Sequence, residues 1–400
     1  MMTSSAQRRR RHGFSLVELL VSIVVGLLAV MFATKLFANA EQNRQASLGG
    51  SAAMQNGMQA LFSITKDAAQ AGWGLNDPLV GGCDTLFSDA RGYQLTATTR
   101  GGVAGTITPL GAAVIESNGA DSDRLTLYAG SSITGSGEVG LGAAYTGGDT
   151  LQVDRIAFGF AQGDVILVVP ESEVAPVPKC ALAQISAPPA VVDNIQSFKI
   201  SAGADYRFNR VAGLGDTYKG GVTRVFNLGP SDALGFHQWS VDGAYLRLRA
   251  SDLAGAGAQS QPVIDNIVSL KAQYGFDTIS SLSFKPEDGM QVRQWSASMI
   301  DADGLAGIGS AGDYQRIAAL RVAVVARSRQ PEKPAADGSC AATTVLPVVF
   351  GSAAPAGVAA VPISVNVAVA GDPIGWQCYR YRVFESIVPM RNLAWRPTNQ

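Results

Sequence analysis

The residues able to do acid–base or metal chemistry in this 400-residue chain are few and lie far apart. His237 has no second histidine near it, so a metal site or catalytic pair would rest on it alone; we expect a surface or half-buried loop residue. Asp301, Asp303 and Asp313 lie in a glycine-rich stretch that suits calcium, but the full EF-hand pattern is missing. Gly135–Gly140 spells GxGxxG without a strand–helix unit, which indicates a turn. We therefore expect no catalytic, cofactor or metal site.

The most unusual ionisable residue is Glu18, because it lies inside an apolar segment. Residues 14–33 carry no other charge. A helix of that length spans roughly 30 Å, the thickness of a bilayer core. A bare carboxylate in lipid costs several kcal/mol, so we expect a functional reason for Glu18. Arg8–Arg11 precede the segment and should stay in the cytoplasm, which places everything after Lys35 outside.

Two simpler explanations of the apolar segment fit less well. A secretory signal would have a shorter apolar run and a small-residue cleavage site beyond it, whereas the residues after Ala33 keep a helical pattern. A plain membrane anchor explains the length of the segment. It does not explain an acid four residues after Phe14.

The stretch Gly13–Leu20, GFSLVELL, resembles the start of type IV pilins and pseudopilins. The resemblance implies that a prepilin peptidase cleaves after Gly13 and N-methylates Phe14, and that the apolar helix later packs in a filament core. The new α-amino group of Phe14 is a cation at the depth of the Glu18 anion. Pairing them between neighbouring subunits offsets the desolvation of both charges and sets the axial stagger.

Four further stretches resemble minor pilins of the PilW type. They are DAAQAGWG at 67–74, VIDNIVSLKAQYG at 263–275, RIAALRVAVVARS at 316–328 and YRVFESIVPMRNLAW at 381–395. The resemblance is weak between 84 and 260, where the chain has glycine-rich insertions. It therefore does not identify the surface that binds partner subunits. It implies a minor pilin that helps to initiate or cap a type IV pilus. Its implied partners are the prepilin peptidase, other minor pilins, the major pilin and a large adhesin-like tip protein.

The elements that position these residues are one long helix and a β-rich head. We expect a leader at 1–13, a transmembrane and filament-core helix at 14–35, its amphipathic second half at 36–75 and a head at 76–400. The fold class is α+β: a long N-terminal pilin helix followed by a large antiparallel β-rich periplasmic head. Gly72 and Gly74 end the helix. Apolar residues at helical spacing are expected to pack under the head: Met54, Met58, Leu61, Phe62, Ile64 and Ala68.

Short apolar or alternating runs predict the strands of the head, and glycine and proline mark its loops. The predicted strands are 123–128, 150–155, 164–169, 198–200, 243–249, 267–274, 317–327 and 379–388, and the loops are 98–119, 213–235, 254–261 and 330–357. In the last strand Tyr379, Tyr381 and Val383 should face inward. Residues 191–199 match 263–271 at six of nine positions, which fits either a duplication or chance.

The four cysteines lack the close pairs of a zinc cluster. All follow the membrane segment, on the side that is oxidising in a Gram-negative envelope. An even count there favours two disulfides, and four cysteines allow three connectivities. We expect a bond between Cys340 and Cys378, which closes the last loop, and therefore one between Cys83 and Cys180.

The charge of the chain argues against non-specific nucleic-acid binding. The net charge is −1, and loss of the four arginines in residues 1–13 takes it to −5. A DNA-uptake or adhesin minor pilin stays an alternative, with these basic and aromatic candidates: Arg380, Arg382, Arg391, Arg396, Tyr379, Tyr381 and Trp395. A J-type minor pseudopilin of the type II secretion system is another, although that family lacks the PilW-like stretches. An enzyme is the least favoured class.

The expected location follows from the same resemblance. The protein would cross the inner membrane once, with a cytoplasmic N-terminus and a periplasmic head, and would then enter the pilus. A head of more than 300 residues with long glycine-rich loops is bulky for a repeated helical lattice. We therefore expect the pilus tip rather than the shaft.

Overall fold

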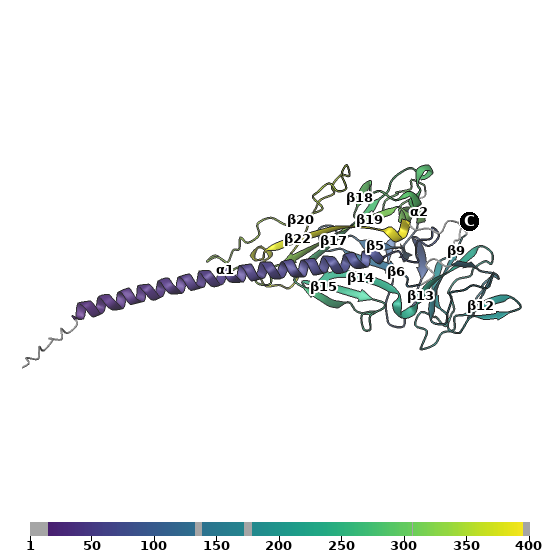
Figure 1. The fold of residues 1–400 in the computed structure, drawn as a ribbon, viewed down its shortest axis with the longest axis horizontal. Coiled ribbons are helices and arrows are strands. Elements are labelled where there is room, and N and C mark those ends of the chain that lie inside the picture. Colours follow the sequence, from purple (N-terminus) through teal and green to yellow (C-terminus); the bar gives the residue numbers. More distant parts are fainter. Residues whose placement is uncertain (1–14, 133–137, 172–177, 306, 395–400) are drawn as a thin grey trace, which may run out of the picture. The chain divides into compact units, whose positions relative to one another are not determined.

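The computed structural model describes residues 15–132, 138–171, 178–305 and 307–394 (Figure 1). The chain divides into two units, Met1–Ser51 and Ala52–Gln400. Helix α1 (Leu16–Gln70) belongs to both, and the strands belong to the second unit, which we call the head. The predicted fold class is confirmed: an N-terminal apolar helix precedes a large, mainly antiparallel sheet-rich domain.

Helix α1 is long because no proline interrupts residues 16–70. It ends where two glycines take left-handed backbone angles, with φ of +83° at Gly72 and +71° at Gly74. The N–H of Gly72 donates to the carbonyl oxygen of Tyr128 at 2.8 Å, which directs the chain onto the head. The predicted helix end is therefore correct to within a few residues.

Two antiparallel sheets form the centre of the head (Figure 1). One runs in the order β16 (Gln261–Asp265), β15 (Tyr245–Ala250), β14 (Gly235–Asp242), β6 (Arg124–Ala129) and β5 (Ala113–Glu116). The other runs in the order β18 (Gln294–Ser296), β17 (Ile267–Phe276), β19 (Ile317–Arg327) and β22 (Tyr381–Pro389). Short helices connect the strands: α2 (Ala311–Gln315), α3 (Arg391–Ala394), and the 3₁₀ turns η1 (Ser231–Ala233), η2 (Ser281–Ser283), η3 (Pro286–Asp288) and η4 (Trp376–Cys378).

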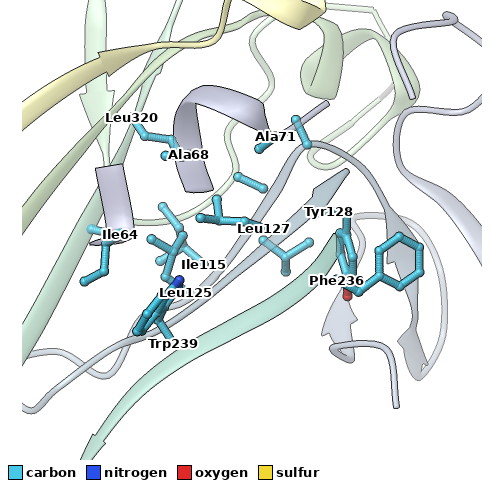
Figure 2. Close-up of a cluster of buried hydrophobic side chains, with 14 of the residues drawn as sticks. Ile64, Ala68, Ala71, Ile115, Leu125, Leu127, Tyr128, Phe236, Trp239 and Leu320 are labelled. Atoms are coloured by element: carbon cyan, nitrogen blue, oxygen red, sulfur yellow. The ribbon is translucent and has the colours of Figure 1, made fainter. Parts of the chain in front are cut away.

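The main core lies between α1 and these two sheets (Figure 2). Helix α1 contributes residues three, four or seven apart, which share one face: Ala53, Ala60, Ile64, Ala68 and Ala71. The sheets contribute Leu125, Leu127, Trp239, Leu320, Val322 and Val324. Full burial of each large aliphatic side chain stabilises the fold by about 1.5–3 kcal/mol.

The predicted apolar stripe of α1 is wrong at three of its six residues. Ile64 and Ala68 are buried and Leu61 is partly buried, but Met54, Met58 and Phe62 are 41%, 53% and 67% exposed. Alanine and glycine line the buried face instead. At Gly57 the reason is close packing, because the ring of Phe384 on β22 fills the space that an added Cβ would take.

Residues 130–234 form a lobe inserted between two paired strands. Ala129 at the end of β6 pairs with Gly235 at the start of β14, so the chain leaves and re-enters the sheet at adjacent positions. The lobe carries β7 (Glu138–Gly140), β8 (Thr150–Val153), β9 (Asp164–Pro170), β10 (Cys180–Gln184), β11 (Ala190–Val192), β12 (Ile195–Lys199) and β13 (Thr223–Pro230). With β1 (Cys83–Leu86) and β4 (Pro109–Leu110), part of it forms a six-stranded sheet in the order β4-β1-β10-β9-β13-β7.

This six-stranded sheet is buried on both faces. Leu167 faces the main core, whereas Ile166 and Val168 face a second core inside the lobe. The second core is completed by Leu151 and Phe198 from the three-stranded sheet β11-β12-β8. Burial on both faces explains why β9 has a continuous apolar run rather than alternation.

The predicted strands are all present, but three of the four predicted loops contain strands. The segment 98–119 holds β2 (Thr98–Thr99), β3 (Thr106–Ile107), β4 and β5; 213–235 holds the buried β13; and 330–357 holds β20 (Val348–Val349), which pairs with β21 (Ile363–Ser364). Glycine suggested turns, yet Gly229 lies at a register shift of β13 with φ +91°, where a bulge accepts it.

The alternation predicted for the last strand is wrong at Val383. Tyr379 is buried and Tyr381 is half-buried, but Val383 is exposed, whereas Phe384 and Val388 pack on the main core. Both faces of this sheet are partly covered, one by α1 and one by the segment that carries β20 and β21. The side chains of β22 therefore do not alternate between one buried face and one exposed face.

The two similar stretches make different turns. In the first, Asp193 and Asn194 both have positive φ and close a two-residue hairpin between β11 and β12. In the second, only Asn266 has positive φ, and the chain passes from β16, paired with β15, to β17, paired with β19. The two stretches are therefore similar in sequence but differ in their turns and strand pairing.

Candidate assembly site

Gly13 and Phe14, the predicted cleavage position, lie outside the described residues. Glu18 lies in the first turn of α1 with an exposed side chain. Among the described residues it has no ion-pair partner. If the segment is covered by lipid or by other helices, this carboxylate needs a cation supplied by that cover.

The first part of α1 is apolar and exposed. The span Leu16–Ala38 carries only two charges, Glu18 and Lys35, none of it is buried, and by length and composition it is able to cross a membrane. Its hydroxyl groups are satisfied within the helix, because Ser22 Oγ donates to the Glu18 carbonyl oxygen at 2.7 Å and Thr34 Oγ1 to that of Val30 at 3.0 Å. Such a surface is suited to lipid or to neighbouring apolar helices.

Inside the head, α1 has a second apolar line on the side away from the core. Met54, Met58 and Phe62 follow at intervals of four residues and are all exposed. The opposite face carries the small residues described above. The helix therefore faces its own head mainly with alanine and glycine, together with Ile64, and presents Met54, Met58 and Phe62 outward.

A charged cluster fastens the last turns of α1 to strand β14. Oδ2 of Asp67 lies 2.8 Å from Nδ1 of His237 and accepts a hydrogen bond from Nε1 of Trp239, also at 2.8 Å. Nε2 of His237 lies 2.9 Å from Oδ1 of Asp252. The prediction of a loop position for His237 is wrong, because it lies on a strand at the centre of its sheet.

The position between two carboxylates fixes the charge of His237. Burial opposes the charge, but the hydrogen bonds to Asp252 and Asp67 and their negative charges prevail and raise the pKa of His237 to about 9. The imidazolium form donates through both ring nitrogens. At neutral pH the cluster is therefore a salt-bridged clasp between the helix and the sheet.

The side-chain amide of Asn392 caps the C-terminal end of α1. Its Nδ2 lies 3.0 Å from the carbonyl oxygen of Gln70 and 3.1 Å from that of Ala71. These carbonyls lie at the C-terminal end of α1, where backbone oxygens have no partner within the helix. Sequence reasoning did not single out Asp67 or Asn392, but both lie in the PilW-like stretches DAAQAGWG and VPMRN.

Both cysteine pairs are joined. Cys83 and Cys180 have Cα atoms 6.1 Å apart, and their bond links β1 to strand β10 of the inserted lobe. Cys340 and Cys378 have Cα atoms 4.8 Å apart, and their bond closes the segment that carries β20 and β21. The first disulfide lies at the main core, because Cys180 is part of that core and Cys83 packs against it, whereas the second ties down the segment between residues 340 and 378.

The acidic cluster of Asp301, Asp303 and Asp313 stabilises its own loop. The carboxylates of Asp301, Asp303 and Asp313 lie within 4.8 Å of one another. Asp313 is fully buried, and its two oxygens accept four backbone N–H groups, from Ala302, Asp303, Gly309 and Ser310. With Ser310 it also forms the capping box of α2. Its acceptor capacity is used by the loop itself.

Of the basic and aromatic candidates, three of those within the described residues are engaged in contacts inside the head. The hydroxyl of Tyr379 donates to Asp372 and that of Tyr381 to the carbonyl oxygen of Trp376, while Arg380 pairs with Glu332. Arg382 and Arg391 are exposed, and Trp395 and Arg396 lie outside the described residues. Of the GxGxxG stretch, Gly135–Gly137 also lie outside them. Glu138–Gly140 form strand β7 against β13, so the predicted turn is wrong there.

Two family models match the chain. The prokaryotic N-terminal methylation motif matches residues 8–34, which include Gly13, Phe14 and Glu18. The model described as type IV pilus-assembly protein W matches residues 238–392, from within β14 to α3, and includes Trp239 and Asn392. The inserted lobe lies outside both matches. No curated protein and no solved structure matches.

Proposed function

We propose that this chain, a prepilin-like protein of the PilW type by its two family matches, is a minor pilin that helps to initiate or cap a type IV pilus. The matches support a type IV pilus-related pilin. Its role at the start or the end of the filament is our proposal, as is its division into a leader at 1–13, a membrane and filament-core helix at 14–35, an amphipathic part at 36–75 and a head at 76–400.

The observation that carries the proposal is the uncovered apolar part of α1 with Glu18 in its first turn. Cleavage between Gly13 and Phe14 would create an α-amino cation four residues before Glu18. The Glu18 carboxylate of one subunit and the Phe14 amine of its neighbour then neutralise each other in surroundings that exclude water. The same helix holds the subunit in the inner membrane before assembly, with the N-terminus cytoplasmic and the head periplasmic.

The inserted lobe supports a position at the pilus tip. In a helical shaft every head has neighbours on all sides, so each added element must fit the lattice at every repeat. Residues 130–234 add a second core and a disulfide-held sheet to one part of the head. A terminal subunit has one side without a neighbour and tolerates such an addition. The partners are then the prepilin peptidase, other minor pilins, the major pilin and a tip protein.

The proposal is tested by processing and incorporation measured together. N-terminal sequencing of the mature protein should begin at Phe14, and Gly13→Val should leave the precursor uncut. Glu18→Ala should lower incorporation into sheared pili without altering membrane insertion. Ser22→Ala is the matched control, because its hydroxyl bonds only within the helix. Equal incorporation of Glu18→Ala and the unsubstituted protein would contradict the assigned role of Glu18.

A further inference from the structure

Strand β22 has a free edge along its whole length. It pairs with β19 on one side, and no strand of the described residues pairs with it on the other. At its two ends, the N–H of Ser328 donates to the carbonyl oxygen of Arg380 at 2.8 Å, and the N–H of Met390 donates to that of Ala318 at 2.9 Å. Hydrogen-bonded pairs alternate along an antiparallel ladder, so the even-numbered residues of β22 bond to β19. The odd-numbered residues therefore point their N–H and C=O groups outward.

The outward backbone groups of β22 form a row without partners. Among the described residues, the backbone groups of Val383, Glu385 and Ile387 make no hydrogen bond. Pro389 fits the same pattern, because a proline is tolerated where the missing N–H would point away from the ladder. A row of free donors and acceptors at strand spacing is complementary to another strand. Lipids, sugars and helices do not present that pattern.

Helix α1 forms a wall beside this free edge (Figure 1). Gly57 faces the ring of Phe384 on β22, whereas Nδ2 of Asn56 donates to the last residue of β16, in the other sheet, at 2.7 Å. With about 3.6 residues per turn, Met54 and Met58 lie on the side of Gly57 away from Asn56. Both side chains are exposed. They therefore lie where a strand added to β22 would cover them.

The direction of β22 argues against a second copy of this chain as the occupant. Phe384 lies against Gly57, and further along both elements Asn392 bonds to the carbonyl oxygen of Gln70, so β22 and α1 run in the same direction. In a second copy paired antiparallel through the same edge, α1 would point the opposite way. The proposed function anchors both copies in one membrane, and the exclusion of a second copy rests on it. The occupant is therefore a different protein.

We propose that the free edge of β22 binds an extended segment of a different protein, which adds a strand to this sheet. The outward backbone groups of β22 supply the hydrogen bonds, and the side chains of the segment that cover Met54 and Met58 are apolar. Arg382 shares a face of β22 with Phe384, is exposed and has no ion-pair partner among the described residues. An acidic residue of the segment beside Arg382 completes the complementarity.

The test is photo-cross-linking of the full chain in the native bacterium. p-Benzoyl-phenylalanine replaces Met54, and mass spectrometry identifies the cross-linked peptides. We expect one segment of a different protein, with apolar residues at alternate positions. The same photoreactive residue at Gln59, which is exposed on the far side of α1, should not capture that segment. Cross-links to lipid alone, to a second copy alone or to no molecule would overturn the proposal.

Proline variants connect the cross-link to the edge of β22. Val383→Pro and Ile387→Pro each remove one outward N–H and no bond to β19, and an edge strand accepts proline at such positions. Each should lose the cross-link from position 54. Val383→Thr and Ile387→Thr are the matched controls, because they keep both the N–H and a β-branched side chain, and they should retain it. Equal cross-linking in the proline and threonine variants would overturn the proposal.

A variant of the wall keeps the test decisive if the proline variants do not fold. Met58→Ser removes apolar surface from α1 without touching β22 and should lower the yield of the cross-link; an unchanged yield would overturn the proposal. Incorporation into sheared pili is measured in the same strains. Absence of the cross-link in cells whose pili contain the chain overturns this inference and leaves the proposed function intact.

Discussion

The ring of Phe384 occupies the space into which any side chain at Gly57 would project. An ideal Cβ on Gly57 would lie 2.1 Å from Cε2 of Phe384, far inside van der Waals contact. Gly57 lies on the buried face of α1 and Phe384 on strand β22, so the helix and this strand approach each other at a glycine. This contact explains why a glycine lies on the buried face at position 57, between the exposed Met54 and Met58.

Gly57→Ala should destabilise the head although alanine is the better helix former. The gain in helix propensity is about 1 kcal/mol, whereas overpacking a filled site costs typically about 1–3 kcal/mol. Denaturant unfolding of the full chain measures the difference. Gly50→Ala is the control, because an added Cβ there meets nothing within 4 Å, and it should be neutral or stabilising. Equal stability of the two variants would mean that Phe384 moves aside freely.

Raising the pH should weaken the clasp between α1 and β14. The pKa of His237 is raised to about 9 in the folded chain from an ordinary 6.5, so its contribution is complete below pH 6.5 and is lost as the pH rises through 9. The shift corresponds to about 3 kcal/mol. The unfolding free energy of the unsubstituted protein should fall between pH 6.5 and 9.5. In His237→Asn this decline should be much smaller; a parallel decline in both proteins would assign it to other groups.

Asn392 should contribute to stability through the end of α1. Asn392→Ala leaves the carbonyl oxygens of Gln70 and Ala71 without their amide donor and should cost about 1 kcal/mol. Asn392→Asp keeps the shape but replaces a donor with an acceptor charge, so it should cost more. Thermal unfolding of both variants tests the ranking. An aspartate variant as stable as the asparagine form would rule out the capping role.

The helix, its end at the glycines and the strands of the head could be predicted, because each depends on local pattern. The face that α1 buries could not be predicted, because it depends on the distance to β22. From the sequence, Gly57 indicates only a weak point in the helix, and its packing against Phe384 is visible only in the structure. His237 likewise reads as an isolated histidine, since its partners Asp67 and Asp252 are distant in sequence. Strand β13 was missed because its glycine marks a bulge rather than a turn.

The disulfide between Cys83 and Cys180 should stabilise the inserted lobe more than the rest of the head. Its sequence separation of 97 residues corresponds to about 4–5 kcal/mol in the chain-entropy model. Replacing both cysteines by alanine should speed hydrogen exchange in β9 and β10 first. Replacing Cys340 and Cys378 should instead loosen the segment around β20 and β21. Non-reducing peptide mapping first establishes that both bonds are present in the purified protein.

The number and position of copies in each filament test the proposed role most directly. Sheared pili carrying an epitope-tagged chain would be examined by immunogold labelling and quantified by mass spectrometry against the major subunit. We predict one or a few copies confined to one end of the filament, and a sharp loss of pili when the chain is deleted. Label distributed along the shaft, at an abundance comparable to the major subunit, would contradict the account.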